Sequence, residues 1–218
     1  MEPISLTTVV SAAGGSVIVP FINKVLGPAA DELGLILGER IRMFRLQNQI
    51  KLFQEAQQML KTAGISPQQV GLKTLLPLME GASIEDDPSL AQKWSALLAN
   101  AANPQSLVTI EPSFAEVLKQ LTTNQAHILQ MAYDAADPTL PKEQWLDKSA
   151  VPAKDILAKL SLSVDQYEIA AANLQRLQLC TNLTDVINGK ITFYGPYNSI
   201  CLGGYGYAFI TACTPPVQ

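Results

Sequence analysis

Apolar side chains recur at steps of three and four residues from residue 22 to about residue 61, and this spacing constrains the fold more than any other feature. One face of an α-helix returns at that interval, so the pattern predicts a long amphipathic helix or two in line. Pro28 suits a first helical turn and predicts a start nearby. Gly64 and Pro67 predict the end, because glycine adopts the left-handed cap and proline cannot continue a helix.

Two more helices are predicted before residue 105. The first is a short apolar helix over residues 72–81, and the second covers residues 88–102. Asp87 directly before Pro88 is a typical helix start, and the pair Asn103-Pro104 is a typical stop. One face of the second helix carries four large apolar residues, which are Leu90, Trp94, Leu97 and Leu98. The first hundred residues therefore indicate an all-helical unit.

The second half begins with helices and changes character near residue 181. Residues 111–138 predict two helices, with a hydroxyl or amide at residues 122–124 able to cap the second. Residues 152–180 predict helix, turn and helix, and Ser163 with Gln166 forms a capping-box signature. After that, Thr, Ile, Tyr and Phe dominate between Asn-Gly, Gly-Pro and Gly-Gly pairs, which is typical of short strands and hairpins.

These elements predict a mainly α fold in which a helical N-terminal unit precedes a winged helix-turn-helix-like unit with a C-terminal β-hairpin. We place an N-terminal arm at residues 1–22, the helical domain at residues 23–105 and the winged-helix-like domain at residues 106–218. The 218 residues are enough for two small domains.

The charge of the chain argues against broad attraction to nucleic acid or anionic lipid. The formal net charge is −4, and residues 106–218 hold ten acidic against seven basic side chains, an excess of three negative charges. Phosphate binding depends on clusters of Lys and Arg, so a groove-reading winged helix is disfavoured. We expect this unit to contact protein.

No residue pattern predicts a catalytic, cofactor or metal site. The three cysteines and the single histidine, His127, are too few and too widely spaced for a zinc centre, and we expect reduced, partly buried thiols. His127 is predicted to pack within its helix. Residues 85–87 are acidic and could hold a hard cation, but Pro88 favours a helix N-terminus. The glycine-rich residues 202–207 lack the following helix that a phosphate loop needs, because this tail is predicted to be strand-rich.

Residues 4–23 contain no charged side chain, which leaves three interpretations. A membrane span is disfavoured by the serines, threonines, Gly14-Gly15 and Pro20 that dilute the hydrophobicity. An arm that packs on the rest of the molecule or on a second copy is favoured. A third interpretation is a segment that is covered in one state and enters a bilayer or a partner in another. A secretory signal is not indicated, because no basic residue precedes the apolar run.

Two motifs follow one another along the chain. The first is a Gly-Pro-x-x-Asp/Glu-x-x-Gly helix start at residues 27–34, and the second is a Leu-x-x-Leu-Ala-x-Ala-like helix that follows the Asp87-Pro88 turn. In their sequence and order these motifs resemble the abortive infection alpha family of bacterial proteins. The close of the chain is similar to that of the family through Gly206, Phe209 and Cys213, whereas Tyr207 stands where arginine is usual. The resemblance, over about residues 20–213, implies a role in phage defence and implies no catalytic residue or cofactor.

Three functional hypotheses follow. The first is a non-enzymatic effector in the cytoplasm, peripheral to the inner membrane when active, that engages membrane, a protein partner or further copies of itself. The second is a regulatory or adaptor module, and the third, least favoured by charge, is a DNA-binding regulator. The candidate contact residues combine the apolar arm with a basic flank: Ile4, Leu6, Val9, Val10, Val17, Ile18, Val19, Phe21, Arg40, Arg42 and Arg45.

Overall fold

The computed structural model describes residues 20, 24, 42–106, 108–136, 150–181, 184–187, 190–193 and 199–217. Within these residues the chain is mainly helical, as predicted, with eight helices and five short strands. The helices are α3 (Arg42–Thr62), α4 (Leu72–Ser83), α5 (Pro88–Ala101), α6 (Ser113–Leu118), α7 (Thr123–Ala135), α9 (Ala153–Leu160), α10 (Val164–Arg176) and α11 (Gly204–Ala212). The strands are β1 (Val151–Pro152), β2 (Cys180–Thr181), β3 (Thr184–Ile187), β4 (Lys190–Phe193) and β5 (Ser199–Leu202).

The chain divides into two compact units. The helical unit comprises Met1–Gln120 and Ala212–Gln218, and the mixed unit comprises Leu121–Thr211. The predicted domain boundary, at 105/106, precedes α6, whereas the two units divide after it. Since α6 packs against α4 and α5, its apolar side chains belong to the core of the helical unit.

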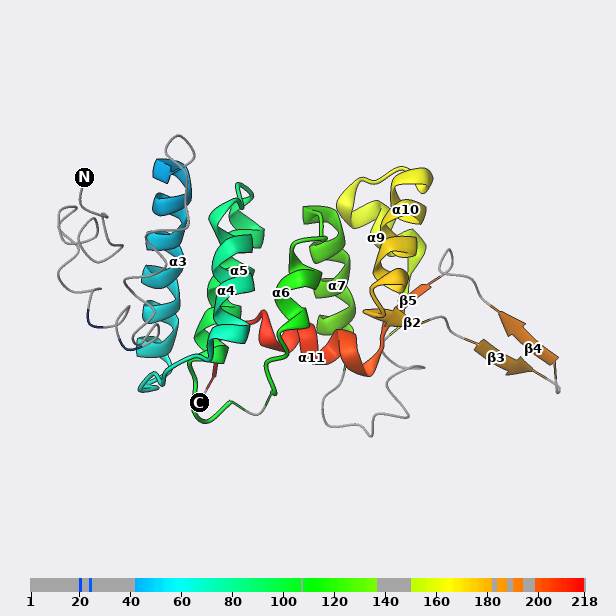
Figure 1. The fold of residues 1–218 in the computed structure, drawn as a ribbon. Helices are drawn as coiled ribbons and strands as arrows, with labels where there is room; N and C mark the ends of the chain where they lie inside the picture. The colour runs from blue at the N-terminus through cyan, green and yellow to red at the C-terminus, as the bar shows by residue number, and fades with distance from the viewer. Residues whose placement is uncertain are drawn as a thin grey trace. The chain divides into compact units, whose positions relative to one another are not determined.

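The helical unit is built around α3, which packs along both α4 and α5 (Figure 1). Its end is the predicted one: Gly64 has φ 68°, and the Ile65 N–H donates to the Leu60 carbonyl over 2.9 Å. This left-handed glycine closes the last turn of α3. The predicted start near Pro28 lies outside the described residues.

Helix α5 begins where the sequence predicts. The Asp87 carboxylate accepts hydrogen bonds from the Ser89 N–H at 2.8 Å and the Leu90 N–H at 3.1 Å, while Pro88 occupies the first turn. Such a cap satisfies amide groups that the helix itself leaves free. The four predicted apolar residues of α5 are all buried, and they are Leu90, Trp94, Leu97 and Leu98.

The C-terminal residues are attached to α5 by one buried amide. The Asn100 side chain donates to the Ala212 carbonyl at 2.9 Å and to the Thr214 carbonyl at 2.7 Å. Carbonyls at the end of a helix have no partner within it, so Asn100 supplies the missing donor to the end of α11. Cys213, between these two carbonyls in sequence, is buried beside this contact.

The mixed unit combines α7, α9 and α10 with a three-stranded antiparallel sheet of order β1-β5-β2. Val151 pairs with Ile200, and Cys180 pairs with Leu202. Both predicted helix starts are confirmed as capping boxes, with Thr122 before α7 and Ser163 before α10. Strands β3 and β4 form a separate antiparallel pair, in which Thr184 pairs with Phe193 and Ile187 pairs with Lys190.

The chain does not end in the predicted β-hairpin. Residues 204–212 form helix α11, although Tyr, Phe, Ile and Thr favour strands. Phe209 and Ile210 are fully buried, and a Cβ added at Gly206 would collide with the Leu179 carbonyl. Close packing against this backbone decides the local structure, so tertiary burial overrides the local strand preference.

Trp94 is packed against Gly81 of α4, and this contact generates a stability prediction. A Cβ at Gly81 would overlap the indole ring, which has no room to move in the buried core. We expect Gly81→Ala to lower the free energy of unfolding by about 1–2 kcal/mol. Overpacking costs about 1–3 kcal/mol, and the higher helix propensity of alanine offsets at most about 1 kcal/mol of that cost.

Urea unfolding followed by circular dichroism measures this loss. The matched control is Gly204→Ala, also within a helix, where nothing lies within 4 Å of the added Cβ. We expect no loss of stability there. Equal losses in both variants would contradict the packing explanation.

Candidate functional site

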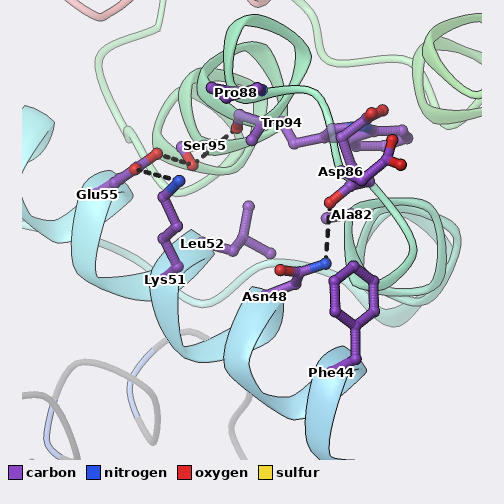
Figure 2. A pocket seen from close by; sticks show the side chains of 12 residues that line it. Phe44, Asn48, Lys51, Leu52, Glu55, Ala82, Asp86, Pro88, Trp94 and Ser95 are labelled. Carbon is purple, nitrogen blue, oxygen red and sulfur yellow. Dashed lines mark hydrogen bonds and ion pairs between the residues drawn. The ribbon is translucent and has the colours of Figure 1, made fainter. Parts of the chain in front are cut away.

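A groove opens between α3 on one side and the end of α4, the α4–α5 connection and α5 on the other (Figure 2). Its cavity has a volume of about 130 Å³. We call it the α3–α5 groove, and it is lined by Phe44, Asn48, Lys51, Leu52, Glu55, Ala82, Glu85, Asp86, Pro88, Ala91, Trp94 and Ser95. All of these residues belong to the helical unit.

The inner end of the groove is formed by buried Trp94, whose orientation is fixed by Glu85. The indole Nε1–H donates to Glu85 Oε2 over 3.2 Å, and the Asp87 N–H donates to Glu85 Oε1 over 3.1 Å. One carboxylate therefore positions both the indole and the turn that leads into α5. Neither of these donors carries a charge that would neutralise it.

Asn48 ties α3 to the opposite wall. Its amide nitrogen donates to the Ser83 carbonyl at 3.1 Å and to the Glu85 carbonyl at 2.9 Å, and Figure 2 shows the side chain crossing between α3 and the α4–α5 connection. Ile84 lies between these two carbonyls in sequence and is 54% exposed. The backbone on either side of Ile84 is thus held while its side chain faces solvent.

The other end of the groove is closed by Ser95 and Glu55. The Ser95 hydroxyl donates to Glu55 Oε2 over 2.8 Å, and Lys51 Nζ lies 3.7 Å from Glu55 Oε1 (Figure 2). Lys51 is mostly exposed, so this helical pair contributes little to stability. Ser95 is only 1% exposed, and its hydroxyl is therefore poorly placed to attack a substrate.

The lining carries a net negative charge and an apolar edge. Glu55, Glu85 and Asp86 against Lys51 leave two negative charges. Phe44 is 48% exposed at one edge, beside the polar wall that Asn48 forms. This arrangement can bind a group that is both cationic and apolar.

Comparison with known proteins places the chain in a family. The family model described as abortive infection alpha matches residues 45–213, well over half of the 218 residues. The chain belongs to the abortive infection alpha family. Membership implies a role in phage defence. No curated protein and no solved structure matches this family member significantly.

The family match includes the second of the two motifs and the close of the chain, whereas residues 27–34 precede it. Each residue of the close has a structural role in this member of the family. Gly206 fits against the Leu179 carbonyl, and both Phe209 and Cys213 are buried. Tyr207 packs on Tyr133 with ring centroids 5.3 Å apart.

Most of the predicted contact residues cannot be placed. The apolar residues of the arm and Arg40 lie outside the described residues, and Arg42 is described only as the first residue of α3. Arg45 is partly buried, and its Nε has no hydrogen-bond partner among the described residues.

Sequence reasoning did not find the α3–α5 groove. The sequence predicts a helix start at the acidic residues 85–87, and Asp87 has that role as the N-cap of α5. Glu85 also accepts a hydrogen bond from Trp94. This contact joins two side chains nine positions apart in sequence, so the helical pattern does not predict it. The exposure of Phe44 and Ile84 could not be predicted from the sequence, because the helical periodicity assigns Phe44 to the apolar face and Ile84 lies outside the predicted helices.

Two predictions about candidate reactive groups need correction. His127 is exposed on α7, because the buried face of this helix is formed by Gln125, Ala126, Ile128, Leu129 and Ala132. The glycine-rich stretch is followed by a helix after all. Even so, the Gly203 N–H donates to the Leu179 carbonyl, and Gly206 packs against that same carbonyl. This part of the backbone therefore faces protein.

No described helix is both long and apolar enough to cross a membrane. Among the same residues, no group of three or more His, Cys, Asp or Glu side chains is arranged to hold a metal ion.

The three cysteines are unbridged, and they are buried more completely than the partly buried thiols that the sequence predicts, so their environment makes them unreactive. Burial raises the pKa of the Cys213 thiol to about 12, and burial also raises that of Cys180. At pH 8, roughly one Cys213 in ten thousand is a thiolate, which is the reactive form. We expect no rapid reaction of the native protein with Ellman's reagent and reaction of all three thiols in urea. One fast native thiol would contradict this assignment.

Proposed function

We propose that this abortive infection alpha protein acts in phage defence by binding, without catalysing a reaction of its own. The observation that supports this role is the state of the side chains in the α3–α5 groove. Asn48, Glu55, Glu85 and Ser95 hold one another or the backbone, whereas Phe44 at the edge is half exposed. Catalysis needs reactive groups that are free to meet a substrate, and binding needs open apolar surface beside fixed polar groups.

In the effector mechanism that we propose, residues 1–22 are covered in the resting protein and become exposed when infection is sensed. They would then engage the membrane or partner chains and arrest the infected cell. The uncharged composition of residues 4–23 supports this mechanism, because such a segment gains free energy when it leaves water. The basic residues Arg40, Arg42 and Arg45 would assist at an anionic surface.

Deleting residues 2–22 tests this mechanism. We expect loss of growth arrest in infected cells and retention of a folded core, since the buried side chains of α3, α4 and α5 all lie beyond the deletion. The deletion should also abolish flotation of the purified protein with anionic liposomes. Circular dichroism and thermal unfolding of the deleted protein provide the control for folding.

Two results would contradict the proposed role of residues 1–22. A deleted protein that still arrests growth would exclude residues 1–22 from the mechanism. If neither form floats with neutral or anionic vesicles, membrane contact is excluded, and the arm would act through packing or through protein partners.

A second candidate function is an adaptor that acts through the mixed unit, which we propose to be a winged helix-turn-helix. The order α7, β1, α9, α10, β2 and β5, with β5 at the centre of the sheet, supports this arrangement. Helix α10 would then be the second helix of the helix-turn-helix, and β3 with β4 would extend the wing between β2 and β5.

The exposed face of α10 favours a protein partner over nucleic acid. Val164 is 57% exposed and Ile169 is 71% exposed, and Asp165 and Glu168 accompany them. The Arg176 guanidinium, at the end of α10, donates to the Asn173 side chain. An apolar and acidic face would be repelled by phosphates, whereas apolar side chains exposed on a helix are common at protein interfaces.

Ile169→Glu separates the two candidate functions. If α10 is the adaptor surface, we expect loss of phage defence with a change in unfolding free energy within about 0.5 kcal/mol, as is usual for surface substitutions. Plaque counts on cells that carry the variant measure defence. Ala158→Glu, an exposed alanine on α9, is the matched control. Full activity of Ile169→Glu would exclude this face and leave the arm as the stronger candidate.

A further inference from the structure

We propose that the α3–α5 groove binds the side chain of an arginine or lysine that a partner protein presents next to apolar residues. This inference rests on the proposed binding function and adds the chemistry of the partner. It depends on the size of the groove, its charge and its exposed apolar edge.

The size of the groove fits one long side chain. Its cavity of about 130 Å³ is smaller than the pockets of about 300–1,000 Å³ that hold cofactors and other small molecules. A single extended side chain is therefore a better match than a nucleotide or a cofactor. The remaining contact would be made by the partner backbone and neighbouring side chains on the rim.

The charge of the groove selects a cation. Glu85 accepts its hydrogen bonds from the Trp94 indole and a backbone N–H, and Glu55 accepts one from the Ser95 hydroxyl. These donors are neutral, so they occupy lone pairs and leave the negative charge uncancelled. Lys51 lies beside Glu55 and supplies one positive charge against three negative ones. A guest ammonium or guanidinium would compensate the remaining charge with charge-assisted hydrogen bonds.

The apolar edge suits the rest of such a guest. The Phe44 ring lines the cavity and is 48% exposed, so it can pack against an alkyl stem or face a cation. Ile84 is 54% exposed on the α4–α5 connection that Asn48 holds, and it can receive an apolar neighbour of the cationic residue. The wall is already fixed by Asn48, so little ordering is required on binding.

The probe is the peptide acetyl-Ala-Leu-Arg-Leu-Ala-amide, with lysine, norleucine or glutamate at the central position for comparison. The readout is the NMR signal of the Trp94 indole N–H, which is bonded to Glu85 in the groove. The chain has two tryptophans, so a Trp145→Phe variant assigns the signal. We expect saturable shifts with the arginine and lysine peptides and at least about tenfold weaker binding of the glutamate peptide.

Two substitutions remove charge while preserving the groove. Asp86→Asn changes an exposed carboxylate, and Glu55→Gln keeps an oxygen that can accept from Ser95. Each substitution should lower the affinity for the arginine peptide about threefold, and the two together about tenfold, as expected for exposed charge pairs. Asp165→Asn, in the mixed unit, makes the same change of charge elsewhere and should leave the affinity unchanged.

The outcomes separate this inference from the proposed function. The inference that the groove binds a cationic side chain would be overturned by either of two results. One is the absence of a saturable shift up to about 10 mM peptide, and the other is equal binding of the glutamate peptide. The double variant Glu55→Gln/Asp86→Asn is then tested in infected cells. If it has lost the arginine peptide but defends fully, the groove binds cations as inferred, and defence does not depend on it. If the arginine peptide does not bind but the double variant fails to defend, the proposed binding function of the groove is retained. The inference that its partner is cationic is then wrong.

Discussion

The contact between Trp94 and Glu85 organises the helical unit. Packing alone would bury the indole ring against Gly81, but a buried N–H without a partner is costly, and Glu85 is the group that satisfies it. The same carboxylate also receives the Asp87 N–H. Core packing, the start of α5 and the shape of the groove therefore depend on one side chain.

The periodic parts of this fold follow from the sequence. Gly64, Asp87 and the capping residue Ser163 could all be predicted, because each satisfies backbone groups within a few residues of itself. Helix α11 could not, because its conformation depends on how closely Gly206 approaches a carbonyl 27 positions earlier in the chain, at Leu179. Local propensity carries no information about such an approach.

The groove was hidden from sequence analysis for a similar reason. Its walls come from residues 44–55 and 82–95, which periodicity describes as two separate amphipathic patterns. Asn48 and Ser95 would be read as ordinary polar positions of their helices, yet each bonds to the opposite wall. What could be predicted was the acidic turn, and what could not was that Asn48 of α3 bonds to its backbone. Polar residues that join two helices are visible only after the helices are packed.

The acidic residues that line the groove differ in how much the fold depends on them. Glu85 cannot be changed to test binding alone, since its loss would leave the Trp94 indole and a backbone N–H without an acceptor. Asp86 is exposed, and Glu55 can be replaced by a neutral amide that still accepts from Ser95. A cationic side chain in the groove would be attracted by all three carboxylates, whereas the fold depends mainly on that of Glu85. Asp86 stands directly before the N-cap of α5, where a negative charge also interacts favourably with the helix dipole, so Glu55→Gln is needed beside Asp86→Asn to separate binding from stability.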